Sequence, residues 1–276
     1  MTEVRIPPPG AAPPAERPAA PYTWVQTMGI DDIILTYSSE HWLGPSHDDS
    51  VQRWDIGMHV KDEVPGPCFG TIELYVVDHW RSWDIIESLD EVSVDLCEIG
   101  TALYDPELGF LRDDLQDDLA LPGKTAIVDR VRMDQRFRGH GLGVYLTGRA
   151  LDYLSHGAGV IALFPSPLDE NDAPLPPPGS QEDEEKALIA ARARLGRAWS
   201  RLGFQHYRDG TWILDPGMRT LHDALCRERQ RLQDYQWNVT FTDTPDSGSI
   251  MSAGISKVTM AKSAPHPLRT APAEGP

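Results

Sequence analysis

The chain has 276 residues, a length that allows one substantial domain with appendages or two small domains. Its formal net charge of -17 argues against a nucleic-acid partner, because contacts between basic residues and phosphates dominate that kind of binding. The three cysteines stand far apart and no segment is long and apolar enough to span a membrane, so we expect reduced thiols, a cytoplasmic location and no metal site.

The N-terminal part divides into a tail and a run of strands. Residues 1–21 are rich in proline and alanine, and they are predicted to form a disordered tail and not a secretory signal. A domain is expected over residues 22–236. Its first strands are predicted at 32–37, 52–60 and 69–77, where apolar and polar residues alternate, and the last two strands form a hairpin or meander.

A helical block follows the third of these strands. Six apolar residues recur there at alternating steps of four and three, namely Ile85, Leu89, Val92, Leu96, Ile99 and Leu103. The spacing predicts one buried helix face, or two short helices that are separated near Ser88 or Asp90, either of which could cap the second helix. An acidic patch comes next, formed by Asp113, Asp114, Asp117 and Asp118. It could bind a metal ion, but a solvated helix face is the favoured interpretation.

The segment from 124 to 154 is the most informative. A strand over 125–133 and a turn over 134–137 lead into Arg138-Gly139-His140-Gly141-Leu142-Gly143, and a helix is predicted over 144–154. Glycines let a backbone approach a ligand closely, and the positive end of a helix attracts anions. Five basic residues crowd into this part of an acidic protein, namely Lys124, Arg130, Arg132, Arg136 and Arg138. The segment therefore predicts a site for an anionic ligand with several phosphates, although an ordinary strand, turn and helix would have the same pattern.

The C-terminal part continues the alternation of strands and helices. A strand is predicted at 159–164, an inserted surface loop rich in proline and acid at 165–183, with a lid as the alternative, and a helix from about 184 to 202. A hairpin is predicted around Asp209-Gly210. An additional helix over 218–235 should pack on the domain, or else pair with a second subunit in a homodimer. Residues 242–276 are predicted to be disordered.

Three of these features together resemble the GCN5-related N-acetyltransferase family. The loop from Arg138 to Gly143 matches the Arg/Gln-x-x-Gly-x-Gly/Ala signature of that family, the strand at 159–164 follows at the expected place, and Leu202-Gly203-Phe204 resembles the entry into the next strand. The resemblance covers residues 124–214. It implies a mixed, mostly antiparallel twisted sheet flanked by helices, with the helical block as an insertion and the last helix as an addition.

The resemblance also implies a cofactor site and its residues. In the family, the signature strand diverges from the next strand, and the pantetheine arm of acetyl-CoA pairs with the exposed backbone. By that resemblance Val131 and Met133 supply backbone contacts to pantetheine. The pyrophosphate is then bound by the loop residues Arg138, Gly139, His140, Gly141, Leu142 and Gly143.

The implied reaction is direct transfer of an acetyl group to an amine. Asp129 is the candidate base, with an ion pair to a nearby arginine as the structural alternative. Trp199 stands where many relatives have a tyrosine as general acid, and Tyr207 and Tyr145 are substitutes by residue type only. The acceptor is expected to be an amine-bearing small molecule or peptide, favoured to be cationic. Two alternatives are an inactive module that binds acyl-CoA or a partner, and an unrelated α/β domain.

Overall fold

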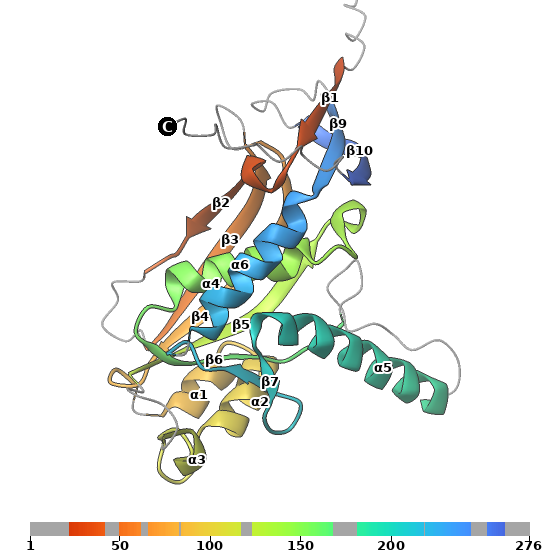
Figure 1. The fold of residues 1–276 in the computed structure, drawn as a ribbon. Helices are drawn as coiled ribbons and strands as arrows, with labels where there is room; N and C mark the ends of the chain where they lie inside the picture. The colour runs from red at the N-terminus through yellow and green to blue at the C-terminus, as the bar shows by residue number, and fades with distance from the viewer. Residues whose placement is uncertain are drawn as a thin grey trace, which may run out of the picture.

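Two sheets organise the molecule. The computed structural model describes residues 22–41, 50–61, 66–82, 84–116, 123–167, 181–217, 219–243 and 253–262. Within these residues, seven strands form a twisted sheet in the order β2-β3-β4-β5-β6-β8-β7, and three form a second sheet in the order β1-β9-β10 (Figure 1). In the large sheet β5 and β6 run parallel and the other neighbours antiparallel. The predicted fold class, a mixed and mostly antiparallel sheet flanked by helices, is confirmed.

The strands of the large sheet lie close to their predicted positions. They are β2 (Ile33–Ser38), β3 (Val51–Val60), β4 (Cys68–Asp78), β5 (Lys124–Met133), β6 (Ala158–Leu163), β7 (Gln205–His206) and β8 (Trp212–Leu214). In β3, alternation buries Ile56, Met58 and Val60 on one face. In β5, all residues from Thr125 to Val128 are buried, because helices or loops cover both faces of this central strand.

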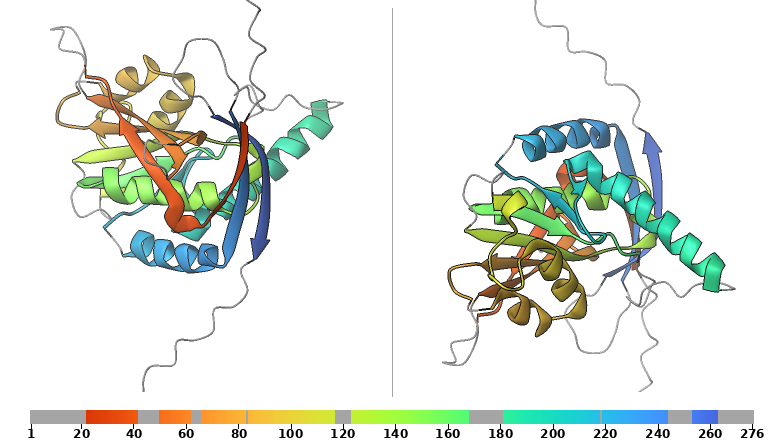
Figure 2. Two further views of the ribbon diagram at one scale, coloured as in Figure 1. Left: turned by 90° about the horizontal axis from the view of Figure 1, so that it is seen from above. Right: turned by 90° about the horizontal axis from the view of Figure 1, so that it is seen from below.

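Two helices cover one face of the large sheet. α4 (Leu142–Leu154) connects β5 to β6 and buries Leu142, Leu146 and Ala150 against the sheet. α6 (Thr220–Gln233), the helix predicted over 218–235, lies alongside α4 (Figures 1 and 2). The two helices approach closely at Gly148, where a Cβ atom would lie 2.8 Å from Leu225 Cδ2.

The inserted helical block covers the other face. It consists of α1 (Ile85–Asp90) and α2 (Val94–Leu103), followed by the short α3 (Asp113–Gln116) (Figure 1). Its apolar residues form a second core cluster with β4, β5 and β6. The prediction that Ser88 or Asp90 caps the second helix is wrong. Ser93 is the cap, since its hydroxyl accepts a hydrogen bond from the Leu96 amide at 3.2 Å. Asp117 and Asp118 lie outside the described residues.

The disorder predicted for residues 242–276 is wrong for 242–243 and 253–262, which lie in strands of the second sheet. β1 (Tyr22–Met28) pairs with β9 (Tyr235–Asp243), and β9 pairs with β10 (Ala253–Lys262). Alternation in β9 buries Trp237, Val239 and Phe241 in the main core. The sequence could therefore have predicted this strand from its period-two pattern. The predicted N-terminal tail over 1–21 lies outside the described residues, as do 244–252 and 263–276.

The remaining elements lie between β6 and β8. α5 (Gln181–Trp199) begins earlier than predicted, so residues 181–183 belong to a helix, and most of the inserted loop, 168–180, lies outside the described residues. α5 extends away from the two sheets in every view (Figures 1 and 2). The predicted hairpin joins β7 to β8, and Asp209 and Gly210 both have positive φ, as a type I′ turn requires.

Candidate functional site

A gap opens between β5 and β6 in the second half of β5. The parallel ladder between these strands ends at the pair Val128 and Leu163. On β5 the next residue, Asp129, is an extra residue in the ladder with β4, because Glu73 pairs with Arg130 while Leu74 pairs with Val128. Such a β-bulge bends a strand and increases its twist. On the other side of the gap, β6 ends before Pro165, which has no amide proton to continue the ladder with β5.

The second half of β5 directs backbone polar groups into this gap. Asp134 donates a backbone hydrogen bond to the Phe69 carbonyl at 2.8 Å, which makes these opposed residues a hydrogen-bonded pair. Hydrogen-bonded and non-hydrogen-bonded pairs alternate along an antiparallel ladder. The register therefore turns the N–H and C=O groups of Val131 and Met133 away from β4. Among the described strands, none pairs with them on that side.

One of these backbone groups is already used within the protein. Arg138 Nε donates to the Met133 carbonyl at 2.6 Å, which fixes the exit of β5 toward the loop. Within the described part of the chain, the N–H and C=O of Val131 and the N–H of Met133 remain as the groups that a ligand could pair with. Val131 and Met133 were both predicted to make such contacts, and the ladder gives that prediction a geometric basis without testing it.

The glycine loop follows β5 directly and ends in the first turn of α4. Residues Gln135–Phe137 form the 3-10 turn η2, and Gly139 and Gly141 then adopt φ angles of 89° and 80°, which favour glycine. Gly141 is the N-cap of α4 and has no side chain to bond the first amides of the helix. Those amides have no partner within the helix, so they are available to an anion.

The other loop residues have distinct environments. Leu142 is fully buried and anchors α4 in the core, whereas Arg138 and Gly139 are exposed. A Cβ atom on Gly143 would lie 3.1 Å from Met133 Cε, so glycine lets the helix approach β5 closely. His140 is partly buried, and its ring lies 6.3 Å from that of Tyr235.

Asp129 lies among other charged groups on the face of the sheet that carries α1 and α2. Its side chain is 6% exposed, and its carboxylate lies 3.4 Å from Arg130 Nε. Burial raises the pKa of Asp129 above its ordinary value, Arg130 lowers it, and the negative charge of Glu73 raises it further. A buried carboxylate with a raised pKa is a stronger proton acceptor than a solvated one. The Asp129 carboxylate thus forms the ion pair that was predicted as the structural alternative, and its raised pKa is also what a base would need.

Sequence reasoning missed two neighbours of Asp129 on β4. Glu73 forms an ion pair with Arg132, and burial raises the pKa of Tyr75, with Arg53 lowering it and Asp129 raising it. Glu73 and Tyr75 are two residues apart on β4 and therefore lie on the same face of the sheet. This spacing could have identified them as neighbours of Asp129 once the pairing of β4 with β5 was known.

The basic residues near the loop do not converge on it as predicted. Arg130 contacts Asp129, Arg132 contacts Glu73, Arg136 contacts Asp134, and Lys124 lies at the opposite end of β5. Each of these three arginines thus has a carboxylate partner. The side chains that do reach Gly141 are Arg201, from the 3-10 turn η3 (Ser200–Leu202), and Arg231, from α6. Neither was predicted, because both lie far from the loop in the sequence.

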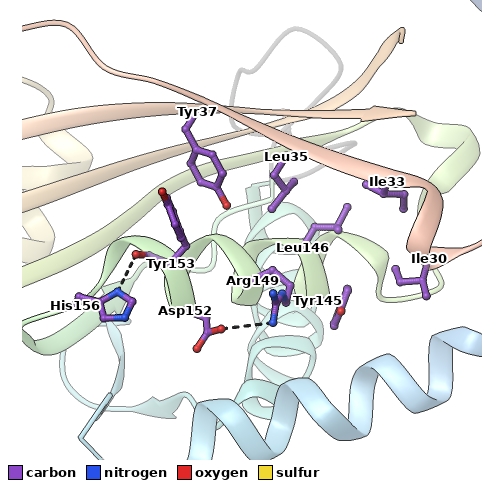
Figure 3. A pocket seen from close by; sticks show the side chains of 10 residues that line it. All are labelled: Ile30, Ile33, Leu35, Tyr37, Tyr145, Leu146, Arg149, Asp152, Tyr153 and His156. Carbon is purple, nitrogen blue, oxygen red and sulfur yellow. Dashed lines mark hydrogen bonds and ion pairs between the residues drawn. The ribbon is translucent and has the colours of Figure 1, made fainter. Parts of the chain in front are cut away.

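Trp199, which stands where a general acid was expected, and its two possible substitutes lie away from the gap. Trp199 is 8% exposed and packs edge-on against Phe204 in the core. The Tyr207 hydroxyl donates to Asp114 at 2.9 Å, and burial together with this bond raises its pKa to about 12. Tyr145 lines a pocket of about 480 Å³ between β2 and α4, none of whose lining residues belongs to β5, β6 or the glycine loop (Figure 3).

Other predicted features can be compared with the described residues. No group of three or more histidine, cysteine or acidic side chains in the described part of the chain is placed to bind a metal ion. The three cysteines are free. No helix that the structure describes is sufficiently long and apolar to cross a membrane.

Comparisons with known proteins do not support the family resemblance. No family model matches the chain, and no curated protein matches it. A match among solved structures is the crystal structure of a mutant of KacT, which is 12% identical and has a TM-score of 0.32, over 63% of this chain and 74% of that chain. Similarity at this level does not establish membership. The prediction that the chain belongs to the GCN5-related N-acetyltransferases is therefore wrong by these comparisons, and the geometry of the site stands without it.

Proposed function

We propose that this protein binds an acyl-CoA thioester in the gap beside β5 and transfers the acyl group, most simply acetyl, to a primary amine. The observation that carries the proposal is the open edge of β5, which leads directly into a glycine loop at the positive end of α4. The five residues from Asp129 to Met133 span about 16 Å at the usual rise of a strand. An extended pantetheine arm fits such an edge.

The residues of the site suit the parts of this ligand. Val131 and Met133 would pair with the amides of the pantetheine arm as an added strand does, by main-chain hydrogen bonds. The amides that follow Gly139 and Gly141 would bind the pyrophosphate at the start of α4. The thioester would then lie at the deep end of the gap, where the ladder with β6 ends and Asp129 begins.

Asp129 is the group best placed to handle a proton. When an amine attacks a thioester carbonyl, a nitrogen–carbon bond forms, the carbon–sulfur bond breaks, and the nitrogen loses a proton. Asp129 would accept that proton, and the environment that raises its pKa makes it a better base. A thiolate is a good leaving group, so the transfer does not depend on Trp199, Tyr207 or Tyr145 as an acid.

A second candidate function, a catalytically inactive module that binds acyl-CoA, is favoured by one observation. Trp199 is in the core and Tyr207 is bonded to Asp114, so neither supplies a proton at the gap. Turnover of acetyl-CoA with a panel of primary amines and amine-bearing peptides separates the two candidates. Thiol release that depends on the amine supports transfer, whereas intact binding without release supports the module.

The first experiment is isothermal titration with acetyl-CoA and with CoA. The parent is expected to bind at micromolar concentration, and Gly141→Trp is expected to abolish binding because the new side chain fills the start of α4. Gly157→Trp is the matched control, since Gly157 has a φ of 82° and lies in an exposed turn with open space around it. Absence of binding by a folded parent, or equal binding by Gly141→Trp, would contradict the proposal.

A further inference from the structure

Two arginines from distant parts of the chain meet at the start of α4. A Cβ atom on Gly141 would lie 2.6 Å from a terminal nitrogen of Arg231 and 2.7 Å from a terminal nitrogen of Arg201. Arg231 also donates to the carbonyl of His140 at 2.6 Å. Both guanidinium groups are therefore held against the glycine loop itself, and not merely near it.

A single buried carboxylate holds both arginines. Glu228, on α6, is 7% exposed and accepts hydrogen bonds from Arg201 Nε at 2.9 Å and Arg231 Nε at 3.0 Å. Its two oxygens thus bind two guanidinium groups, whose side chains are 34% and 35% exposed. We call these three residues the arginine clasp. It connects η3, α6 and the loop before α4.

The charge of the arginine clasp is not balanced by its own members. Two guanidinium groups and one carboxylate leave one positive charge, and it lies beside the positive end of α4, which is the wrong end of a helix for a cation. On the same helix, Arg229 has its own carboxylate partner, Asp31, at 2.8 Å. Unlike Arg229, Arg201 and Arg231 share one carboxylate, so the excess positive charge of the arginine clasp lies beside the loop.

A purely structural clamp would not need this excess. One arginine between Glu228 and the His140 carbonyl would be sufficient to connect α6 to the loop, as Arg231 already does. The second guanidinium adds repulsion, which a partly buried site tolerates when an anion is present to offset it. A guanidinium binds phosphate oxygens with two parallel hydrogen bonds, so the chemistry that suits this position is a phosphate.

We propose that Arg201 and Arg231 bind the phosphate groups of the acyl-CoA and so select a nucleotide-linked thioester over a simple one. The proposal rests on the function proposed above, but it adds residues that no local motif contains. Glu228 then acts as a positioning residue that orients both guanidinium groups and limits how tightly they bind the anion.

The test measures dissociation constants for Arg201→Gln and Arg231→Gln with three probes: acetyl-CoA, S-acetylpantetheine and 3′,5′-ADP. Loss of one charge-assisted hydrogen-bonding group is expected to weaken acetyl-CoA and 3′,5′-ADP about tenfold in each variant. S-acetylpantetheine, which has no nucleotide phosphates, should bind equally to parent and variants. Arg229→Gln is the matched control on α6 and should leave all three constants unchanged, because its side chain contacts Asp31 and not the loop.

Glu228→Gln separates phosphate binding from a structural role. The variant keeps the shape and the acceptor oxygen of the side chain while removing the negative charge, so it is expected to be less stable thermally but to bind 3′,5′-ADP more tightly than the parent. Weaker binding in proportion to lost stability would overturn the proposal. The parent should also lose affinity for acetyl-CoA as salt is raised, and each arginine variant should show a shallower dependence.

The outcomes distinguish this proposal from the function on which it rests. If the parent binds 3′,5′-ADP through Arg201 and Arg231 as tightly as it binds acetyl-CoA, and does not bind S-acetylpantetheine, the phosphate site stands and the proposed function in the gap beside β5 is overturned. If the parent binds acetyl-CoA and both arginine variants bind it equally well, the arginine clasp is structural and the proposal is overturned. If no probe binds a folded parent, both are overturned.

Discussion

The two halves of β5 belong to one strand and have opposite environments. From Lys124 to Val128 the strand has partners on both sides and is buried from Thr125 onward. From Asp129 to Met133 it keeps β4 as a partner but has no described strand on the other side, and its two arginines are only partly buried. The first half therefore stabilises the fold, and the second half is the part of β5 that the proposed function assigns to ligand binding.

The difference between the environments of the two halves of β5 arises from two local features and not from the strand-forming tendency of its residues. The bulge at Asp129 bends β5. On the β6 side, Pro165 has no amide proton with which to continue the ladder to β5. A single bulged residue thus separates the doubly paired half of β5 from the half with an open edge and places a carboxylate at their boundary.

Among the predictions, proline substitutions should show the largest difference between the two halves of β5. Ile127→Pro removes an amide within the doubly paired and fully buried half, so we expect no folded protein to be recovered. Val131→Pro removes an amide that points into the gap, so the ladder with β4 survives. We expect a folded variant whose affinity for acetyl-CoA falls by a factor of a few to about ten, the net value of one hydrogen bond.

Circular dichroism and thermal unfolding check the first half of this prediction, and titration with acetyl-CoA checks the second. Val131→Ala is the control for the loss of the side chain, and it should retain most of the affinity. If Val131→Pro unfolds like Ile127→Pro, the two halves of β5 do not differ as described.

A smaller but more specific effect is expected for Asp129→Asn. If Asp129 accepts the amine proton, turnover should fall about 10²- to 10⁴-fold, the usual contribution of a general base, while acetyl-CoA binds as it does to the parent. Steady-state kinetics and titration measure the two quantities separately. The pH profile of the parent should rise through a pKa above the ordinary 3.8 of aspartate, and this rise should vanish in the variant. Equal loss of turnover and of cofactor affinity would indicate a structural ion pair instead.

The same substitution is expected to stabilise the fold at neutral pH. Burial raises the pKa of Asp129, so the folded state favours its protonated form and its ionisation costs stability as the pH rises through that pKa. The variant, which does not ionise, should have a higher melting temperature than the parent at pH 7. The difference should disappear well below pH 3.8, where the carboxyl is protonated in both states. A variant that is less stable at every pH would show that the contact with Arg130 dominates.

Sequence reasoning succeeded where the determinants of structure are adjacent in the chain. Alternation located β3 and β4, and the glycine loop was correctly placed between a strand and a helix, because each depends on a few consecutive residues. The second sheet was missed although β9 alternates clearly, because its strands come from opposite ends of the chain. Local patterns do not reveal such distant pairing.

The charges of the site show the same limit. Arg130, Arg132 and Arg136 were grouped because they are close in sequence, but each of them contacts a nearby carboxylate, Asp129, Glu73 or Asp134, and not the loop. Arg201 and Arg231 meet at Gly141 only because η3 and α6 pack on α4. A family resemblance did not supply this information either, and the comparisons did not uphold it.

The smallest expected effect concerns Tyr207, which tests whether chemistry is confined to the second half of β5. Its hydroxyl donates to Asp114, and burial with this bond raises its pKa to about 12, so it remains protonated across the neutral range and acts as a structural donor. Tyr207→Phe should lower the free energy of unfolding by about 1 kcal/mol, the net value of one partly exposed hydrogen bond, and should leave turnover within about twofold of the parent. Denaturant unfolding and steady-state kinetics measure both, with Tyr153→Phe as the control for loss of an exposed hydroxyl. A fall in turnover as large as that expected for Asp129→Asn would extend the reacting site beyond β5 to the β7–β8 hairpin.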